Sequence, residues 1–155
     1  MSYINELASS LGTYLYGRKM YETMVYWETA HEQPDMTQVA LTWADQWKAA
    51  EKIVFSKTLT EIRSERTRIE RDFDAEKIRQ LKAESPHDIS VDGTELAAVA
   101  IKAGLVDEIH QIICPVLVGG GKRFYPDGVK LDLKLFDERH FDSGVVILKY
   151  AVLNK

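Results

Sequence analysis

Apolar and polar residues recur along the chain with two different periods, and the changes of period divide it into helices and strands. Apolar positions at helical spacing predict a first helix over residues 2–11, which Gly12 ends. The β-branched and aromatic residues 13–16 then predict a strand, and residues 20–27 predict the helix that follows it. The chain therefore opens with helix, strand and helix.

The middle of the chain continues this alternation. Thr37 is a suitable N-cap for a helix that extends to about Ala50. Residues 52–56 form a near-continuous apolar run, which is typical of a parallel, buried strand. The charged segment 67–71 predicts an edge strand, and Asp74 begins a helix that extends to about residue 85.

In the last third of the chain, alternating strands and helices give way to a predicted antiparallel hairpin. A strand over residues 89–91 leads through Gly93 into a helix that ends at Gly104. Residues 109–118 are apolar enough to predict a buried strand, and residues 131–136 and 145–152 predict a C-terminal hairpin. The pattern predicts an α/β fold in which a mixed sheet is flanked by helices and ends in an antiparallel hairpin.

Composition narrows the class of protein. A chain of 155 residues predicts one domain, over residues 1–155, and 45% hydrophobic residues suffice for a real core. The net charge of −4 argues against nucleic acid or an anionic membrane as a partner, and no run of 18 apolar residues occurs. The single cysteine, Cys114, lies in the apolar run and predicts a buried thiol and a reducing, cytoplasmic setting. The four histidines lack the spacing of a metal site.

Three predicted strand ends carry groups that suit an anionic ligand. In an open α/β sheet such ends converge on one side, where ligands bind. The residues at these ends are Gly17, Arg18 and Lys19, then Ser56, Lys57 and Thr58, then Asp92, Gly93, Thr94 and Glu95. Each group alone is equally compatible with a solvated turn or an ordinary strand–helix connection. Together they suit an extended, multiply phosphorylated cofactor better than one small anion.

These segments resemble a known family. The run Tyr14–Glu22 resembles the strand–Gly-Arg-x-x-x-Glu segment of dihydrofolate reductase-like proteins, and residues 53–58 resemble their second cofactor strand. Residues 90–108 and 115–124 resemble the reductase domain of bacterial riboflavin biosynthesis. The resemblance implies a dihydrofolate reductase-like fold and NADPH as the cofactor. It also implies hydride transfer to a small-molecule substrate of the pteridine-like or ribosylaminopyrimidine type, and a homodimer.

By the family pattern, each of the three groups of residues would bind a different part of the cofactor. Gly17, Arg18 and Lys19 would lie against the phosphates, and residues 56–58 would lie near the adenosine 2′-phosphate. Gly93, Thr94 and Glu95 would hold the pyrophosphate at a helix start.

The chain departs from the family at two places. Asp92 stands where the family has the first glycine of a pair, so a carboxylate would lie near the pyrophosphate. The family's first strand and substrate loop have no counterpart before residue 3, which predicts a shortened chain, a sheet closed by another chain, or a loss of catalysis. No catalytic acid is assigned, and Glu6 is the nearest acid on the first helix. The alternative function is a non-catalytic nucleotide-binding or oligomerising module on the same fold.

Overall fold

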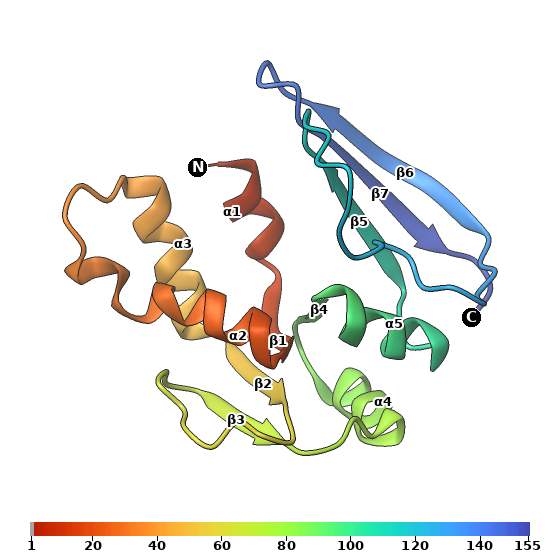
Figure 1. Cartoon of the computed structure of the whole chain (residues 1–155), viewed down its shortest axis with the longest axis horizontal. Helices are drawn as coiled ribbons and strands as arrows, with labels where there is room; N and C mark the ends of the chain where they lie inside the picture. The colour runs from red at the N-terminus through yellow and green to blue at the C-terminus, as the bar shows by residue number, and fades with distance from the viewer. Residues whose placement is uncertain (1) are drawn as a thin grey trace. The chain divides into compact units, whose positions relative to one another are not determined.

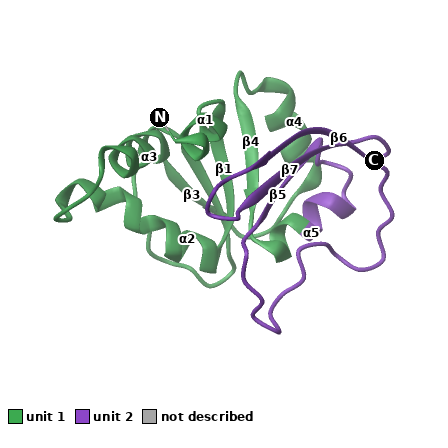
Figure 2. Ribbon diagram, turned by 90° about the horizontal axis from the view of Figure 1, so that it is seen from above, with its two compact units in different colours: residues 1–97 green, residues 98–155 purple. Residues whose placement is uncertain are grey.

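The computed structural model describes residues 2–155, and these residues form two compact units that divide the chain between Ala97 and Ala98 (Figure 2). In chain order the elements of the first unit are α1 (Tyr3–Ala8), β1 (Leu11–Gly17), α2 (Arg18–Met24), a 3₁₀ helix (Val25–Glu32), α3 (Gln38–Ala49), β2 (Glu51–Phe55), β3 (Thr67–Glu70), α4 (Ala75–Glu84) and β4 (Asp88–Asp92) (Figure 1). Helix α5 (Thr94–Lys102) begins in this unit and continues into the second.

The first unit is built on a four-stranded parallel sheet with the strand order β3-β2-β1-β4. Strand β1 pairs with two neighbours, so that Tyr16 lies opposite Val54 on β2 and opposite Asp92 on β4. The charged strand β3 lies at the edge, as the sequence predicts, and its charges protect that edge from pairing with other chains.

The two faces of this sheet are covered by different helices. Tyr14, Tyr16 and Val54 share one face and form a core cluster with Tyr21 of α2 and Trp47 of α3. The indole Nε1–H of Trp47 donates to the Tyr16 hydroxyl at 3.0 Å, so the polar atoms of two buried aromatic side chains satisfy each other. On the opposite face, Ile53 and Phe55 of β2 line a shallow hollow together with Ile78 and Leu81 of α4.

Lys52 is a buried cation within the aromatic core. It is 1% exposed, and its Nζ donates to the carbonyl oxygens of Trp47 (3.1 Å) and Lys48 (3.4 Å) at the end of α3. The ammonium also lies 4.3 Å from the centre of the Trp47 ring. A cation at a helix C-terminus satisfies free carbonyls and interacts favourably with the helix dipole, which accounts for its place in the core.

Local sequence signals for helix starts are confirmed. The Thr37 hydroxyl accepts from the N–H of Ala40, and the Asp74 carboxylate accepts from the N–H groups of Glu76 and Lys77. These side chains satisfy N–H groups that have no partner within their helices.

The predictions for the first helix are correct in type but wrong in detail. Gly12 does not end the helix but lies within β1, where the close approach of His87 leaves no room for a side chain, since a Cβ would come within 2.6 Å of the His87 Cβ. The buried side of α1 is formed by Asn5 and Ala8, whereas Ile4 is exposed. Asn5 is buried because its side-chain amide donates to the carbonyl of Val39, which links α1 to α3.

The second unit carries a three-stranded antiparallel sheet with the order β5-β7-β6. Its strands are β5 (Glu108–Ile113), β6 (Leu133–His140) and β7 (Val146–Val152). The predicted C-terminal hairpin is confirmed as β6 and β7, and the α/β class is confirmed as well. The parallel and antiparallel strands lie in separate sheets. The expectation of an absent first strand stays a prediction.

The prediction of a buried strand over residues 109–118 is wrong beyond Ile113. Strand β5 ends there, Cys114 is exposed rather than buried, and Leu117 is 93% exposed. Ile113 lies opposite Val146, the first residue of β7, so the residues that follow Ile113 have no neighbouring strand to continue the ladder. Within residues 2–155, no helix has both the length and the apolar character needed to cross a membrane.

Lys52→Met is expected to change how stability depends on pH. Burial lowers the pKa of Lys52 to about 8, although nearby Glu28 and Glu51 raise it. The unfolded chain therefore holds more protons than the folded one between pH 8 and 10.5, and stability from this group rises over that window. Between pH 7.5 and 9.5, wild type should gain about 2 kcal/mol relative to Lys52→Met in denaturant unfolding. The exposed Lys130→Met should show no such trend.

Candidate functional site

The carboxyl ends of β1, β2 and β4 lie side by side at one edge of the parallel sheet. In the register of the ladder, Gly17 is opposite Phe55, and Tyr16 is opposite Asp92. The segments that follow these three positions are therefore neighbours, as the sequence predicts for strand ends of an open sheet. We call them the first corner (residues 17–19), the second corner (56–58) and the third corner (92–95).

The second corner is a turn held by side chains. The Ser56 hydroxyl oxygen accepts from the N–H groups of Thr58 (3.3 Å) and Leu59 (3.0 Å), and the Ser56 N–H donates to the carbonyl of Glu70 on β3. The Arg71 guanidinium donates to the carbonyls of Ser56 (2.8 Å) and Leu59 (2.6 Å). The backbone of this turn is therefore fixed from both sides, and Lys57 extends from it 80% exposed.

The first corner is joined to the second by one hydrogen bond. Arg18 begins α2, and its Nη1 donates to the Thr58 hydroxyl at 2.8 Å. Its Nε donates to the Glu22 carboxylate one helical turn later, also at 2.8 Å. Lys19 is exposed, and among residues 2–155 no ion pair involves it. The corner thus presents one cation that is already paired and one that is available to an anion.

The third corner turns sharply into α5. Gly93 has φ +98°, a conformation that side chains other than glycine rarely adopt, and a Cβ there would lie 3.9 Å from the Met20 Cβ of α2. The Ala97 N–H donates to the Gly93 carbonyl, so the helix starts directly after the turn. Thr94 is partly buried and Glu95 is exposed in the first turn. This turn therefore lies beside the first turn of α2, next to the first corner.

Asp92 places a carboxyl group on the aromatic face of the sheet. It is partly buried and accepts from the Ser90 hydroxyl at 2.6 Å. Burial raises the pKa of Asp92 above its usual range, and the Ser90 hydrogen bond offsets part of this effect. Burial and the Asp92 charge raise the pKa of Tyr14 to about 12 and raise that of Tyr16 further. The carboxyl group therefore lies on the same face of the sheet as the two tyrosines, one residue before the Gly93 turn.

Sequence reasoning missed two residues at this edge. Arg71 supports the second corner through backbone carbonyls, and Asp72 pairs with Lys57, with Nζ and Oδ1 3.6 Å apart. Both follow directly after β3, so their position past the end of an edge strand is the signal that could have identified them.

The other candidate residues do not join the three corners. Glu6 is exposed on α1, which leads into the amino end of β1, whereas the corners lie at the carboxyl ends. Among residues 2–155, no cluster of three or more His, Cys, Asp or Glu side chains could hold a metal ion.

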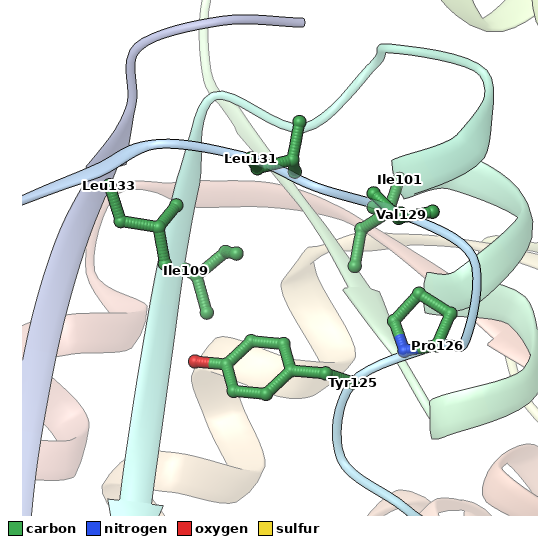
Figure 3. Close-up of a pocket in the computed structure, with 7 residues that line it drawn as sticks. All are labelled: Ile101, Ile109, Tyr125, Pro126, Val129, Leu131 and Leu133. Atoms are coloured by element: carbon green, nitrogen blue, oxygen red, sulfur yellow. The ribbon is translucent and has the colours of Figure 1, made fainter.

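The second unit contains an apolar cavity of about 180 Å³ (Figure 3). The Tyr125 hydroxyl lies at its wall and donates to the Gln111 side chain at 3.0 Å. The lining residues are Ile101, Ile109, Tyr125, Pro126, Val129, Leu131 and Leu133. This lining contains no charged side chain, so the cavity can accept an apolar group but offers nothing to neutralise a phosphate.

Comparisons with known proteins add family information to this geometry. A family model described as the RibD C-terminal domain matches residues 2–147. Among curated proteins, the uncharacterized protein YyaP of Bacillus subtilis (strain 168) is 33% identical over 150 residues, which cover 94% of this chain and 76% of YyaP.

Solved structures share the fold. A Shewanella sp. PV-4 protein named for riboflavin biosynthesis superposes with a TM-score of 0.70 at 16% identity, over 96% of this chain and 78% of its own. A pyrimidine reductase-like protein of Corynebacterium diphtheriae superposes with a TM-score of 0.66 at 14% identity, over 98% of this chain and 80% of its own.

Asp92→Asn is expected to raise stability more at pH 8 than at pH 4. The pKa of Asp92 is raised in the folded protein, so folding disfavours its ionised form, and the stability from this group falls as pH rises through that pKa. Asparagine keeps the shape and does not ionise. The melting temperature of the variant should exceed that of wild type at pH 8, and the difference should shrink towards pH 4. A pH-independent difference, like that expected for the exposed Asp35→Asn, would contradict this assignment.

Proposed function

The chain belongs to the RibD C-terminal domain family, and from this premise we propose that it is a reductase of riboflavin biosynthesis that uses NADPH. The family supports a reductase-type role in that pathway. The name of the Corynebacterium relative, a pyrimidine reductase-like protein, favours a ribosylaminopyrimidine over a pteridine as the acceptor of the hydride.

The observation that carries this proposal is the convergence of the three corners at one edge of the parallel sheet. The Arg18–Thr58 hydrogen bond joins the first two corners, and the register of Tyr16 with Asp92 places the third beside them. Arg18, Lys19 and Lys57 supply cations along this edge. A row of cations of this kind suits an elongated polyanion such as a dinucleotide better than a single phosphate.

The residues present fit such a cofactor. A Cβ at Gly17 would meet no atom within 4 Å, so the first corner is open to a ligand, and the positive φ of Gly93 brings bare backbone to the start of α5. Arg18 and Lys19 would bind the bridging phosphates, and residues 56–58 would bind the adenosine end. NADPH supplies the hydride when it is bound, and the protein's contribution is to hold and orient it.

Asp92 favours a second candidate function, a nucleotide-binding module without turnover. Its carboxyl group lies directly before the turn that would receive the pyrophosphate, where an ionised form would repel the ligand. The two functions differ in one measurement: a module binds NADPH but does not oxidise it in the presence of any ribosylaminopyrimidine or pteridine.

Arg18→Gln is expected to weaken NADPH binding roughly tenfold, because it removes one charge-assisted hydrogen bond to a phosphate. Binding is followed by quenching of tryptophan fluorescence, since three tryptophans supply the signal. Arg79→Gln is the matched control, because Arg79 carries the same charge on α4 and pairs with Glu76. Equal affinity of both variants for NADPH, or no binding by wild type at millimolar NADPH, would contradict the proposal.

A further inference from the structure

We propose that Asp72 sets the choice between a dinucleotide with a 2′-phosphate and one with a free ribose 2′-hydroxyl, by competing with the phosphate for Lys57. This inference rests on the proposed function, because it takes the second corner as the place where the adenosine end lies. Beyond that function, the inference assigns a role to Asp72, which lowers the preference for NADPH over NADH.

Lys57 is the cation of the second corner that a 2′-phosphate can use. Of the two arginines nearby, Arg71 supports the turn, and Arg18 is the one that the proposed function assigns to the bridging phosphates. Arg71 donates to backbone carbonyls of the turn, and Arg18 bonds to Glu22 and Thr58. The Lys57 ammonium is 3.6 Å from the Asp72 carboxylate, and both side chains are 80% exposed. A phosphate can therefore reach Lys57, but it must take the place of Asp72.

The ion pair is held between two fixed segments. The turn that carries Lys57 is fixed by the Ser56 hydroxyl and by Arg71. Asp72 follows Arg71 directly, so the guanidinium that supports the turn also keeps the carboxylate close to it. The local fold thus fixes the backbone that carries Lys57, and the two paired side chains extend from it into solvent.

The group at the 2′ position of the adenosine ribose, a phosphate in NADPH and a hydroxyl in NADH, decides whether Asp72 weakens or supports binding. In dinucleotide-binding folds an acidic side chain accepts a hydrogen bond from the ribose 2′-hydroxyl, whereas a cation accommodates a 2′-phosphate. Here an acid and a cation stand together. A 2′-phosphate gains Lys57 but meets the negative charge of Asp72, while a 2′-hydroxyl can donate to Asp72 without disturbing the pair.

An independent feature lies on the other side of Asp72. This residue lines a hollow of about 60 Å³ whose floor includes Phe55, Ile78 and Leu81. The hollow is too small to enclose a purine. Its lining combines the apolar side chains of Ile53, Phe55, Ile78 and Leu81 with the charged side chains of Arg68, Glu70, Asp72, Asp74 and Lys77. Asp72 therefore borders both this hollow and the Lys57 ammonium.

The test measures binding of 2′,5′-ADP and 5′-AMP by calorimetry, and of NADPH and NADH by tryptophan fluorescence, with the full chain. Asp72→Asn should bind 2′,5′-ADP about fivefold more tightly than wild type at low salt, because exposed ion pairs and like charges act on this scale. It should bind 5′-AMP no more tightly than wild type. The matched control is Asp45→Asn, which removes an exposed, paired acid from α3.

A double-mutant cycle isolates the competition. In the Lys57→Gln background, Asp72→Asn should change the affinity for 2′,5′-ADP less than twofold, because the paired ammonium that the substitution would release is already absent. An equal gain in both backgrounds, or a gain no larger than that of Asp45→Asn, overturns the inference. Failure of 2′,5′-ADP to bind any variant overturns it as well.

These outcomes are distinct from failure of the proposed function. The expected pattern with 2′,5′-ADP, together with no NADPH oxidation in the presence of a ribosylaminopyrimidine, supports the role of Asp72 and contradicts the reductase. NADPH binding and oxidation with equal 2′,5′-ADP affinities in wild type and Asp72→Asn overturns the role of Asp72 and leaves the reductase in place.

Discussion

The parallel pairing of β1 with both β2 and β4 is the constraint on which the first unit depends. Backbone hydrogen bonds on both sides of β1 fix three strands in one register, and Tyr16 is thereby aligned with Val54 and Asp92. The same register places the aromatic side chains of β1 against Trp47 and Tyr21. Shifting a strand by one residue would exchange its two faces, so the packing of the core and the positions of the strand ends are determined together.

Two of the three cations of the candidate site are already partly neutralised by the protein. Arg18 is paired with Glu22 and Lys57 with Asp72, and both pairs are exposed. Such pairs contribute little to stability, on the order of 1 kcal/mol or less each. Under the proposed function, a phosphate that binds at either pair would take the place of a carboxylate. The acids at the edge would then help to determine which anion binds.

The contrast between Lys52 and Lys57 shows how position decides the role of one residue type. Lys52 follows directly after α3 in β2, where its ammonium closes the end of the helix within the aromatic core. Lys57 extends from a turn into solvent beside Asp72. Lys52 keeps its contacts with the carbonyls of α3 and serves the fold. Lys57, under the proposed function, can exchange Asp72 for a ligand. Only four residues lie between them, and nothing in the local pattern assigns the two roles.

The sequence by itself determined the α/β class, the order of the elements and the three strand ends, because periodicity, N-caps such as Thr37 and Asp74, and glycine turns act over a few residues. Only the tertiary structure decided the roles of Gly12, Lys52 and Asp72. Gly12 is required by the approach of His87, and Asp72 acquires its role from a lysine on another strand's turn. The apolar pattern also predicts a buried strand after Ile113, where the structure shows exposed residues. Apolar composition predicts a strand, but whether that strand has neighbours depends on contacts between distant parts of the chain.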